Sequence, residues 1–332
     1  MRTRRLGRDG PEVSALGLGC MGMSDFYGQA DEAESLATLR EAVEAGVTLL
    51  DTGDFYGTGH NELLIARALE GVPRDRVFLA VKFGALRDPA GGWGGFDCRP
   101  AHVRNYLAQT LRKLRTDHVD LYQPSRVDPA LPIEEVVGTM AELVRAGWVR
   151  YLGLSEAGPE TLRRAAAVHP VAALQIEYSL MSRGPEAGLL ATCRALGTGI
   201  TAYGVLSRGL LGGSIGASGP DRPGDGRGRF PRFQGENLRR NLALVEALRA
   251  AAAERGATPA QLAIAWVLSR GEDIVPLVGA RRRDQLRDAL RALELRLSPE
   301  ELARIEAAVP AAAVAGTRYD PRGMGLLDSE KA

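Results

Sequence analysis

Short apolar runs alternate with amphipathic segments along most of the chain. The amphipathic segments, in which apolar residues recur with helical spacing, include 31–46, 99–114, 132–147 and 237–256. The apolar runs lie at 15–20, 47–53, 77–83, 119–125, 149–155, 171–178, 199–205 and 273–279. Strand-like runs that alternate with helices are typical of βα units and a parallel sheet, and about eight such units close a barrel. The pattern therefore predicts an α/β fold, a (β/α)8 TIM barrel.

The two ends of the chain depart from this alternation. Residues 1–17, MRTRRLGRDGPEVSALG, come before the first complete βα unit, and we expect them to form a short β-hairpin that caps the bottom of the barrel. The tail 317–332 has weak patterning and is expected to be loosely ordered. No shift in composition marks a boundary, and barrels routinely reach this length as one unit. The sequence therefore predicts a single barrel domain over residues 1–332.

Two segments that follow predicted strands are rich in glycine and polar residues. Segment 86–100 is a Gly-rich loop that carries Trp93 and Phe96, and segment 212–233 is dense in Gly, Pro, Asp and Arg. Barrel enzymes build their sites from the loops that follow the strands. We expect 212–233 to be a lid over the site, because long loops in compact domains are usually functional or disordered. For 86–100, a solvent loop and an aromatic wall of a substrate pocket are equally compatible with the sequence.

Charge and cysteine content narrow the classes of partner. Lys and Arg number 42 and Asp and Glu number 41, so a formal net charge of +1 gives no reason to expect nucleic acid or an anionic membrane. No apolar stretch is long enough to span a bilayer, and none follows the basic N-terminus as in a signal peptide, so we expect a cytoplasmic location. Cys20, Cys98 and Cys193 have no disulfide or zinc-site spacing. Small molecules are the expected partners, with no metal; the oligomeric state stays open.

Three polar residues fall near the ends of predicted strands. Asp51 and Lys82 end apolar runs, and Tyr56 follows Asp51 by five residues. The C-terminal ends of barrel strands meet at the face where catalytic residues gather. A lysine is costly to bury alone, so Asp51 is its expected partner. Its ammonium should lower the pKa of the Tyr56 phenol, which makes Tyr56 a candidate general acid; a structural salt bridge beside a loop tyrosine is the alternative.

The segment LLDTGDFYGTGHNELLIARAL (49–69) resembles the aldo-keto reductase signature around the catalytic aspartate and tyrosine. Further matching segments are GLGCMGMS (17–24), VKFG (81–84), GLSEA (153–157), LQIEYSLMSR (174–183), ITAYGVLSRGLLGG (200–213) and IVPLVGARRRDQL (274–286). The resemblance covers nearly the whole chain. It implies an NADPH-dependent reductase of small molecules whose dinucleotide is held by barrel loops, and no GxGxxG opens a helix after a strand here.

The resemblance also assigns residues to each part of the cofactor. Tyr203 would stack on the nicotinamide, with Ser155 and Gln175 at its carboxamide. Residues 207–210 would lie along the pyrophosphate, and Arg281 with Arg282 would bind the adenosine 2′-phosphate. The full set of implied cofactor contacts is Met21, Gly22, Asp51, Ser155, Gln175, Tyr203, Gly204, Val205, Leu206, Ser207, Arg208, Gly209, Leu211, Gly279, Arg281, Arg282, Gln285 and Asp288. Asp288 stands where the family usually has glutamate, which implies weaker adenine binding.

One position departs from the family in the chemistry itself. In DLYQPSRVDP (120–129), Ser125 takes the place of a histidine that in the family orients the carbonyl oxygen and helps to pass the proton. A serine hydroxyl can donate one hydrogen bond, but it does not titrate near neutrality. Of the chain's histidines, His60 lies close to Tyr56 in sequence, but we expect it to cap the next helix.

The substitution leaves three hypotheses open. Asp51, Tyr56, Lys82 and Ser125 could together reduce a carbonyl, with the serine or a water in the histidine's role. The roomier site could instead reduce a cyclic imine or a conjugated alkene. The protein could also bind NADPH as a sensor or regulatory subunit with little turnover. The sequence favours carbonyl reduction, because Asp51, Tyr56 and Lys82 are all retained.

Overall fold

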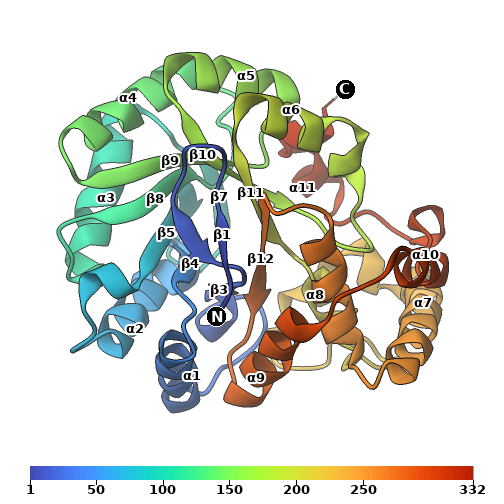
Figure 1. The fold of residues 1–332 in the computed structure, drawn as a ribbon. Coiled ribbons are helices and arrows are strands. Elements are labelled where there is room, and N and C mark those ends of the chain that lie inside the picture. The colour runs from blue at the N-terminus through green and yellow to red at the C-terminus, as the bar shows by residue number, and fades with distance from the viewer. Residues whose placement is uncertain (332) are drawn as a thin grey trace.

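The chain folds, in a computed structural model that describes residues 1–331, into a closed barrel of parallel strands surrounded by helices (Figure 1). In order around the barrel, the strands are β3 (Gly17–Gly19), β4 (Leu49–Gly53), β5 (Phe78–Phe83), β8 (Val119–Pro124), β9 (Val149–Ser155), β10 (Val171–Glu177), β11 (Gly199–Tyr203) and β12 (Ile274–Gly279). The pairing of β12 with β3, in which Val278 lies opposite Leu18, closes the circle. The predicted (β/α)8 fold is confirmed.

Helices alternate with the barrel strands along the chain and lie outside them (Figure 1). They are α1 (Glu32–Glu44), α2 (His60–Ala68), α3 (Pro100–Leu114), α4 (Ile133–Arg145), α5 (Pro159–Val168), α6 (Leu189–Leu196), α7 (Gly235–Glu254), α8 (Pro259–Ser269), α9 (Arg283–Arg291), α10 (Pro299–Ala308) and α11 (Pro321–Gly325). Both α7 and α8 lie between β11 and β12 in sequence, so this unit carries one helix more than the simple repeat.

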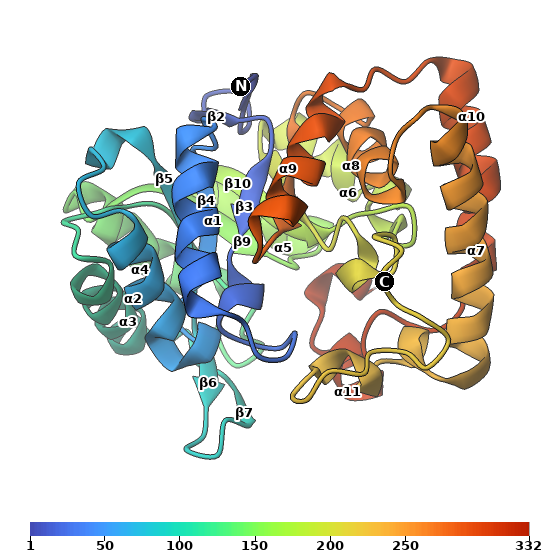
Figure 2. The same cartoon turned by 90° about the horizontal axis from the view of Figure 1, so that it is seen from below.

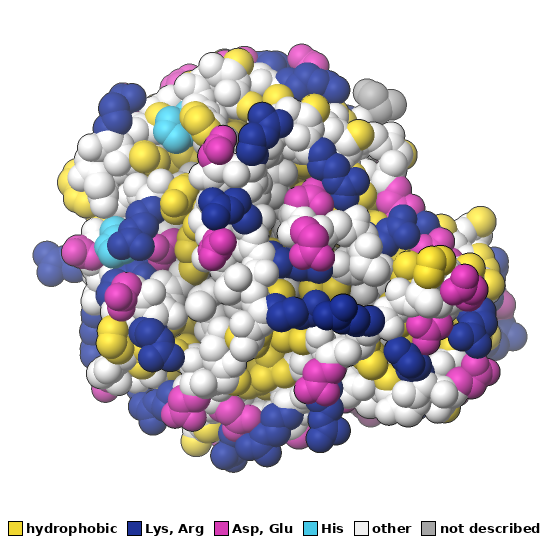
Figure 3. Space-filling model, viewed as in Figure 1, with side chains coloured by type: hydrophobic (Ala, Val, Ile, Leu, Met, Phe, Trp, Pro, Cys, Tyr) yellow, Lys and Arg dark blue, Asp and Glu magenta, His cyan; other side chains and the backbone are white. Residues whose placement is uncertain are grey.

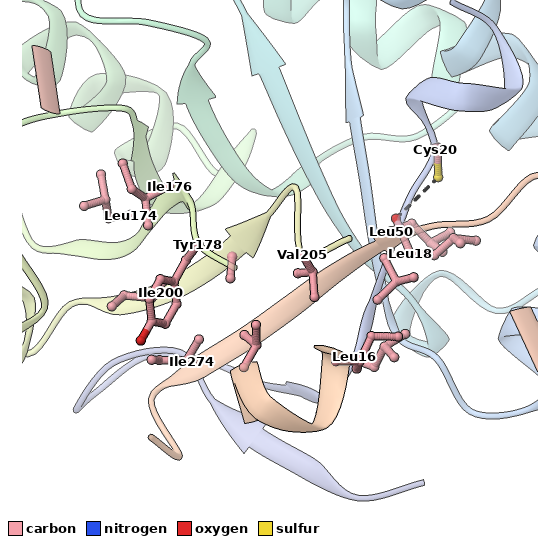
Figure 4. Packing of buried hydrophobic residues seen from close by; sticks show 14 of the residues in the cluster. Leu16, Leu18, Cys20, Leu50, Leu174, Ile176, Tyr178, Ile200, Val205 and Ile274 are labelled. Atoms are coloured by element: carbon pink, nitrogen blue, oxygen red, sulfur yellow. Dashed lines mark hydrogen bonds between the residues drawn. The ribbon is translucent and has the colours of Figure 1, made fainter. Parts of the chain in front are cut away.

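The alternation of side chains along each strand divides the core into two parts. On β5, Leu79, Val81 and Phe83 belong to the large cluster between strands and helices, whereas Phe78 and Ala80 face the barrel interior. Figure 4 shows part of the large cluster, with Leu18 and Leu50 close together. Lys82 therefore points inward, because it lies two and four residues beyond Ala80 and Phe78.

The bottom of the barrel is filled by apolar side chains and covered by a hairpin. Strands β1 (Thr3–Arg5) and β2 (Glu12–Ser14) pair antiparallel. Leu6, in the turn between them, is fully buried in the interior cluster with Leu49 and Leu121. Arg4 donates to the carbonyls of Gly271 at 2.8 Å and Leu268 at 2.7 Å. The predicted N-terminal hairpin is confirmed.

Two segments at the opposite end contain more regular structure than their sequences indicate. Within 86–100, Trp93–Phe96 forms β7, which pairs with β6 (Ala85–Arg87), so much of the expected loop is a β-hairpin. Segment 212–233 contains two short 3-10 helices, η6 (Gly226–Arg229) and η7 (Pro231–Phe233). Figure 2 shows the β6–β7 hairpin and α11 at the end of the barrel opposite β2.

The expectation of a loosely ordered tail is wrong for residues 317–331; residue 332 lies outside the described residues. Arg318 is buried and donates to the Glu156 carboxylate through both terminal nitrogens, at 2.7 Å and 2.6 Å. The apolar pattern of the sequence does not indicate this contact, because an ion pair holds the tail against the barrel and an apolar stripe does not.

Basic and acidic side chains are interspersed over the face seen in Figure 3. The charges of the chain nearly cancel, as the net charge of +1 requires. Within residues 1–331, none of the helices combines the length and the apolar character that crossing a bilayer requires.

Candidate active site

A buried ion pair lies inside the barrel, towards the C-terminal ends of its strands. Lys82 Nζ lies 2.5 Å from Asp51 Oδ1, and both side chains are nearly inaccessible. Neighbouring strands bring them together, since β4 and β5 pair with Asp51 opposite Ala80 and Gly53 opposite Lys82. Gln175 of β10 donates to the other oxygen, Oδ2, at 2.7 Å. Asp51 therefore has both oxygens occupied and is fixed from two sides.

Tyr56 lies beside this pair. The Lys82 ammonium is 5.1 Å from the centre of the Tyr56 ring. The backbone after Tyr56 turns through a left-handed stretch, with φ of 55° at Gly57, 53° at Thr58 and 93° at Gly59. A φ of 93° at Gly59 is a conformation that other residues rarely adopt, so this turn favours a glycine there.

The expected lowering of the Tyr56 pKa does not appear in this arrangement. Burial raises the pKa of the Tyr56 phenol well above its ordinary value, and Asp51 adds to the effect. Burial also lowers the pKa of Lys82, although Asp51 opposes this. The Lys82 charge is already committed to Asp51 at close range, so little of it acts on the phenol. Tyr56 is consequently a phenol that keeps its proton at neutral pH.

These residues open into one cavity of about 1190 Å³. All four of the expected catalytic residues, Asp51, Tyr56, Lys82 and Ser125, line it. Phe55 and Trp93 form an aromatic wall, with ring centres 5.6 Å apart. The hairpin β6–β7 thus supplies the pocket wall that the sequence left open as one of two possibilities.

Ser125 follows β8 and is 3% exposed. Its backbone N–H donates to the Phe83 carbonyl at 2.8 Å, but its hydroxyl has no hydrogen-bond partner within residues 1–331. None of the chain's four histidines, all within the described residues, lines the cavity. His60 instead bonds Ser24 at 2.8 Å and approaches Glu32 at 3.4 Å. The position of the expected histidine is therefore held by a buried, unpaired hydroxyl.

Sixteen of the eighteen expected cofactor residues line the same cavity. Those that line the cavity are Met21, Gly22, Asp51, Ser155, Gln175, Tyr203, Gly204, Val205, Leu206, Arg208, Gly209, Gly279, Arg281, Arg282, Gln285 and Asp288. Ser207 and Leu211 do not line it, and both are buried. The Ser155 hydroxyl, at the end of β9, is 1% exposed and has no partner within the described residues. A buried hydroxyl of this kind requires a ligand or water.

A strained turn follows β11 beside the cavity. Ser207, Arg208 and Gly209 all have positive φ, at 47°, 55° and 96°. Successive residues of unusual backbone conformation point N–H groups to one side and favour anions. The Arg208 guanidinium, however, is bound to Glu177 at 3.1 Å and to the Arg318 carbonyl at 2.7 Å. The turn therefore offers its backbone to an anion, while its arginine side chain holds the tail.

The three consecutive arginines after β12 have different surroundings. Arg282 is paired with Asp284 and Arg283 with Glu34, each at 2.9 Å. Arg281 has no carboxylate partner within residues 1–331 and donates to the carbonyls of Tyr27 and Gly28 at 3.0 Å and 3.2 Å. Burial and then the neighbouring Arg222 and Arg227 lower its pKa, which indicates an excess of positive charge.

The adenine-side residues are partly occupied by protein contacts. The Asp288 carboxylate accepts from Gln261 at 2.6 Å and from Thr258 at 3.1 Å. Gln285 Oε1 accepts from the Arg281 N–H at 3.2 Å. Asp288 therefore holds the start of α8, which sequence spacing did not indicate.

Sequence reasoning missed a buried network beneath Tyr203. Glu156, with φ of 55°, accepts from the Tyr203 hydroxyl at 2.7 Å and from Arg318. Although burial raises the pKa of Glu156, Arg318 and Arg126 outweigh it and hold the pKa at about 2. Arg318 could not be found from sequence, because the tail that carries it has no motif.

The chain is similar to known proteins in sequence and in fold. The sequence model of the aldo/keto reductase family matches residues 15–310. "Probable aldo-keto reductase 1" of Glycine max is 42% identical over 95% of this chain and 91% of its own length.

Solved structures of similar fold give the same result. A glycerol dehydrogenase, AKR11B4 from Gluconobacter oxydans, superposes with a TM-score of 0.83 at 29% identity, over 93% of this chain and 96% of the other. The holo form of aldo-keto reductase AKR11C1 from Bacillus halodurans superposes with a TM-score of 0.76 at 28% identity, over 94% and 97%.

Asp54 lies between Asp51 and Tyr56 in sequence and has an unusual pKa. One of its carboxylate oxygens is buried without a partner in the described residues. Burial and the nearby Glu62 raise its pKa to about 7. Glu62, on α2, is itself paired with Lys113 at 3.0 Å. The loop that carries Tyr56 thus contains a carboxyl group that ionises near neutrality.

We predict that Asp54→Asn removes a pH dependence of stability. The folded protein keeps a proton on Asp54 between about pH 4 and pH 7 that the unfolded chain releases, so ionisation destabilises the fold as the pH rises through this range. The variant should gain unfolding free energy relative to wild type at about pH 8 and much less at about pH 5. Denaturant unfolding at both pH values measures this, with the exposed Asp75→Asn as control. A difference that does not change with pH would contradict the prediction.

Proposed function

Because the chain belongs to the aldo/keto reductase family, we propose that it is an NADPH-dependent oxidoreductase that reduces an aldehyde or ketone to an alcohol. The observation that carries the proposal is the meeting of Asp51, Tyr56, Lys82 and Ser125 in one cavity, at the C-terminal ends of their strands. The acceptor is a small or medium organic molecule, as the volume of about 1190 Å³ shared with a cofactor allows.

The proton in this reaction comes from Tyr56. A carbonyl gains a hydride at carbon and a proton at oxygen to become an alcohol; a nicotinamide held in this cavity would supply the hydride. Tyr56 holds its proton at neutral pH and gives it to the carbonyl oxygen, after which solvent restores it. The Lys82 ammonium, 5.1 Å from the ring centre, stabilises the phenolate that remains. Asp51 and Gln175 keep Lys82 in place.

Ser125 supplies a second hydrogen bond to the same oxygen. Its hydroxyl is buried, lines the cavity and has no partner within the described residues, so it is available to a ligand. Removing one donor of this kind from an active site costs about two to three orders of magnitude in kcat where the donor is well placed. The serine thus supplies a hydrogen bond to oxygen without a second titratable group.

Several residues fit an NADPH molecule. The orphaned Ser155 hydroxyl suits a carboxamide, and the Ser207–Gly209 turn offers backbone N–H groups to a pyrophosphate. Arg281 lacks a carboxylate partner within residues 1–331 and suits a 2′-phosphate, which NADH does not carry. These features support NADPH over NADH.

Relatives favour oxygen chemistry over the two alternatives. The structural neighbour from Gluconobacter oxydans is a glycerol dehydrogenase, which acts on an alcohol and therefore on the reverse of carbonyl reduction. Reduction of a cyclic imine or a conjugated alkene is the second candidate, since a site with Ser125 is less specialised for binding a carbonyl oxygen than a site with histidine. A sensor with little turnover is third, because it would not need a tyrosine beside a buried Lys82.

We predict that Tyr56→Phe abolishes turnover and leaves the cofactor bound. Loss of the proton donor should lower kcat by about two to four orders of magnitude. The dissociation constant of NADPH, measured by fluorescence titration, should change by less than about threefold, because the ring is retained. Tyr106→Phe on α3, which removes a phenol hydroxyl outside the cavity, serves as control. Unchanged turnover in the Tyr56 variant would remove the phenol from the mechanism.

We predict that Arg281→Ala weakens NADPH more than NADH. A charged hydrogen bond to phosphate is worth about 1.5–3 kcal/mol, so the affinity for NADPH should fall about tenfold or more. The affinity for NADH should change little, and Arg283→Ala, which is paired with Glu34, should change neither. Calorimetric titration of both cofactors decides this. Equal weakening of the two cofactors would place the 2′-phosphate elsewhere.

We predict that Ser125→Ala slows carbonyl reduction about tenfold or more without slowing other acceptors. Wild type and variant are compared by NADPH oxidation with aldehydes, ketones, cyclic imines and enones. Aldehydes and ketones should be the better wild-type substrates and should lose kcat in the variant. A wild type that reduces only imines or enones would favour the second candidate function.

A further inference from the structure

Three buried arginines in and around the cavity have a carboxylate partner. Arg208 and Arg232 lie 3.1 Å and 3.3 Å from Glu177, and Arg318 lies 2.6 Å from Glu156. A buried charge that is not paired is costly, and these contacts offset that cost.

Arg126 is different. It directly follows Ser125 and lines the same cavity. Its guanidinium donates to the Ser125 carbonyl at 2.6 Å and to the Tyr319 hydroxyl at 3.0 Å, both neutral acceptors. Within residues 1–331, no carboxylate forms an ion pair with it, although several lie deeper in the network.

Counting hydrogen atoms shows that Tyr319 does not neutralise Arg126. The Tyr203 hydroxyl gives its proton to Glu156 at 2.7 Å. The Tyr203–Tyr319 bond of 3.1 Å must therefore take its proton from Tyr319. Tyr319 receives the Arg126 bond as a neutral phenol. A chain of donors runs from Arg126 through both tyrosines to Glu156, and the positive charge stays at the cavity end.

The charge of Arg126 reaches the reacting groups. Burial dominates the raised pKa of Tyr56, and Arg126 is the nearby cation that opposes it. For Lys82, burial lowers the pKa and Arg126 lowers it further. Burial raises the pKa of Tyr319, but Arg126 and Arg208 outweigh it, so the net pKa is lowered. The Arg126 guanidinium therefore acts on Tyr56 and Lys82 as well as on Tyr319.

We infer that Arg126 binds a carboxylate on the acceptor, so that the substrate class is a short oxo acid. The inference rests on the proposed carbonyl reduction. With the carbonyl oxygen at Tyr56 and Ser125, a carboxylate a few bonds away reaches the guanidinium of the next residue. The anion would supply the partner that Arg126 lacks, and a planar carboxylate matches the fork of a guanidinium.

The test compares acids with their neutral esters in the full-length protein with NADPH. The pairs are glyoxylate with its methyl ester, and succinic semialdehyde with its methyl ester. Wild type should prefer at least one acid by about 10- to 100-fold in kcat/KM, the factor expected for a charge-assisted pair. In Arg126→Gln the ratio of acid to ester should fall to about one, and Arg126→Lys should lie between, since it keeps only the charge. The exposed Arg240→Gln is the control and should keep the wild-type ratio.

Binding provides a readout that does not depend on turnover. Oxamate, an unreactive carboxylate, and oxamide, its neutral counterpart, are titrated calorimetrically into the NADPH complex. Wild type should bind oxamate at least about tenfold more tightly than oxamide, and Arg126→Gln should bind both alike. This result would support the carboxylate site even if no carbonyl in the panel is reduced, an outcome that would overturn only the proposed function. Esters reduced as well as acids, with oxamate binding unaffected in Arg126→Gln, would overturn the carboxylate site alone. A preference for glyceraldehyde phosphate over both acids would overturn it in favour of a phosphate.

Discussion

The buried ion pair of Lys82 and Asp51 is the interaction on which the site depends. Two charges removed from water are stable only in close and well-bonded geometry, and each needs the other. The pair lies where apolar residues of the barrel interior give way to polar ones, with Leu49 and Ala80 in the core just below. Because β4 and β5 are fixed side by side, the distance of 2.5 Å follows from the barrel itself. Tyr56 can then be placed beside a charge that does not move.

The pair also explains why Tyr56 keeps its proton. Asp51 neutralises Lys82 at short range, so the phenol experiences burial more than a cation, and its pKa is raised. The sequence-based prediction considered the effect of Lys82 on the Tyr56 pKa. It did not consider that Asp51 and Tyr56 compete for the Lys82 charge. The cation matters after the proton has left, when the phenolate needs a partner. In the resting state the phenol therefore stays protonated, and it can act as an acid towards a bound acceptor.

Much of the fold could be predicted, because apolar runs alternate with segments whose apolar residues recur about every 3.6 positions. Each barrel strand begins and ends within three residues of a predicted run. The pairing of Asp51 with Lys82 could be predicted for a related reason, since a charge in an apolar run needs a partner.

The hairpin β6–β7 could not be predicted, because its glycine-rich sequence has no alternation of apolar and polar residues. The contacts of Arg318 and Tyr319 could not be predicted either, because their partners lie more than a hundred residues away in sequence, as in the bond of Arg318 to Glu156. Such contacts depend on where the tail crosses the barrel mouth, which no local pattern encodes.

Ser125 and Arg126 together suggest how a barrel can do without the histidine. A histidine combines a hydrogen bond with a charge that changes near neutrality. Here the two are divided: the serine hydroxyl is free to donate, and the next residue carries a charge that does not titrate. Arg126 is tied through Tyr319 and Tyr203 to Glu156, so this chain of hydrogen bonds fixes the direction of its guanidinium. The charge of Arg126 therefore does not change in the range where histidine would switch, and we propose that this fixed charge selects the acceptor.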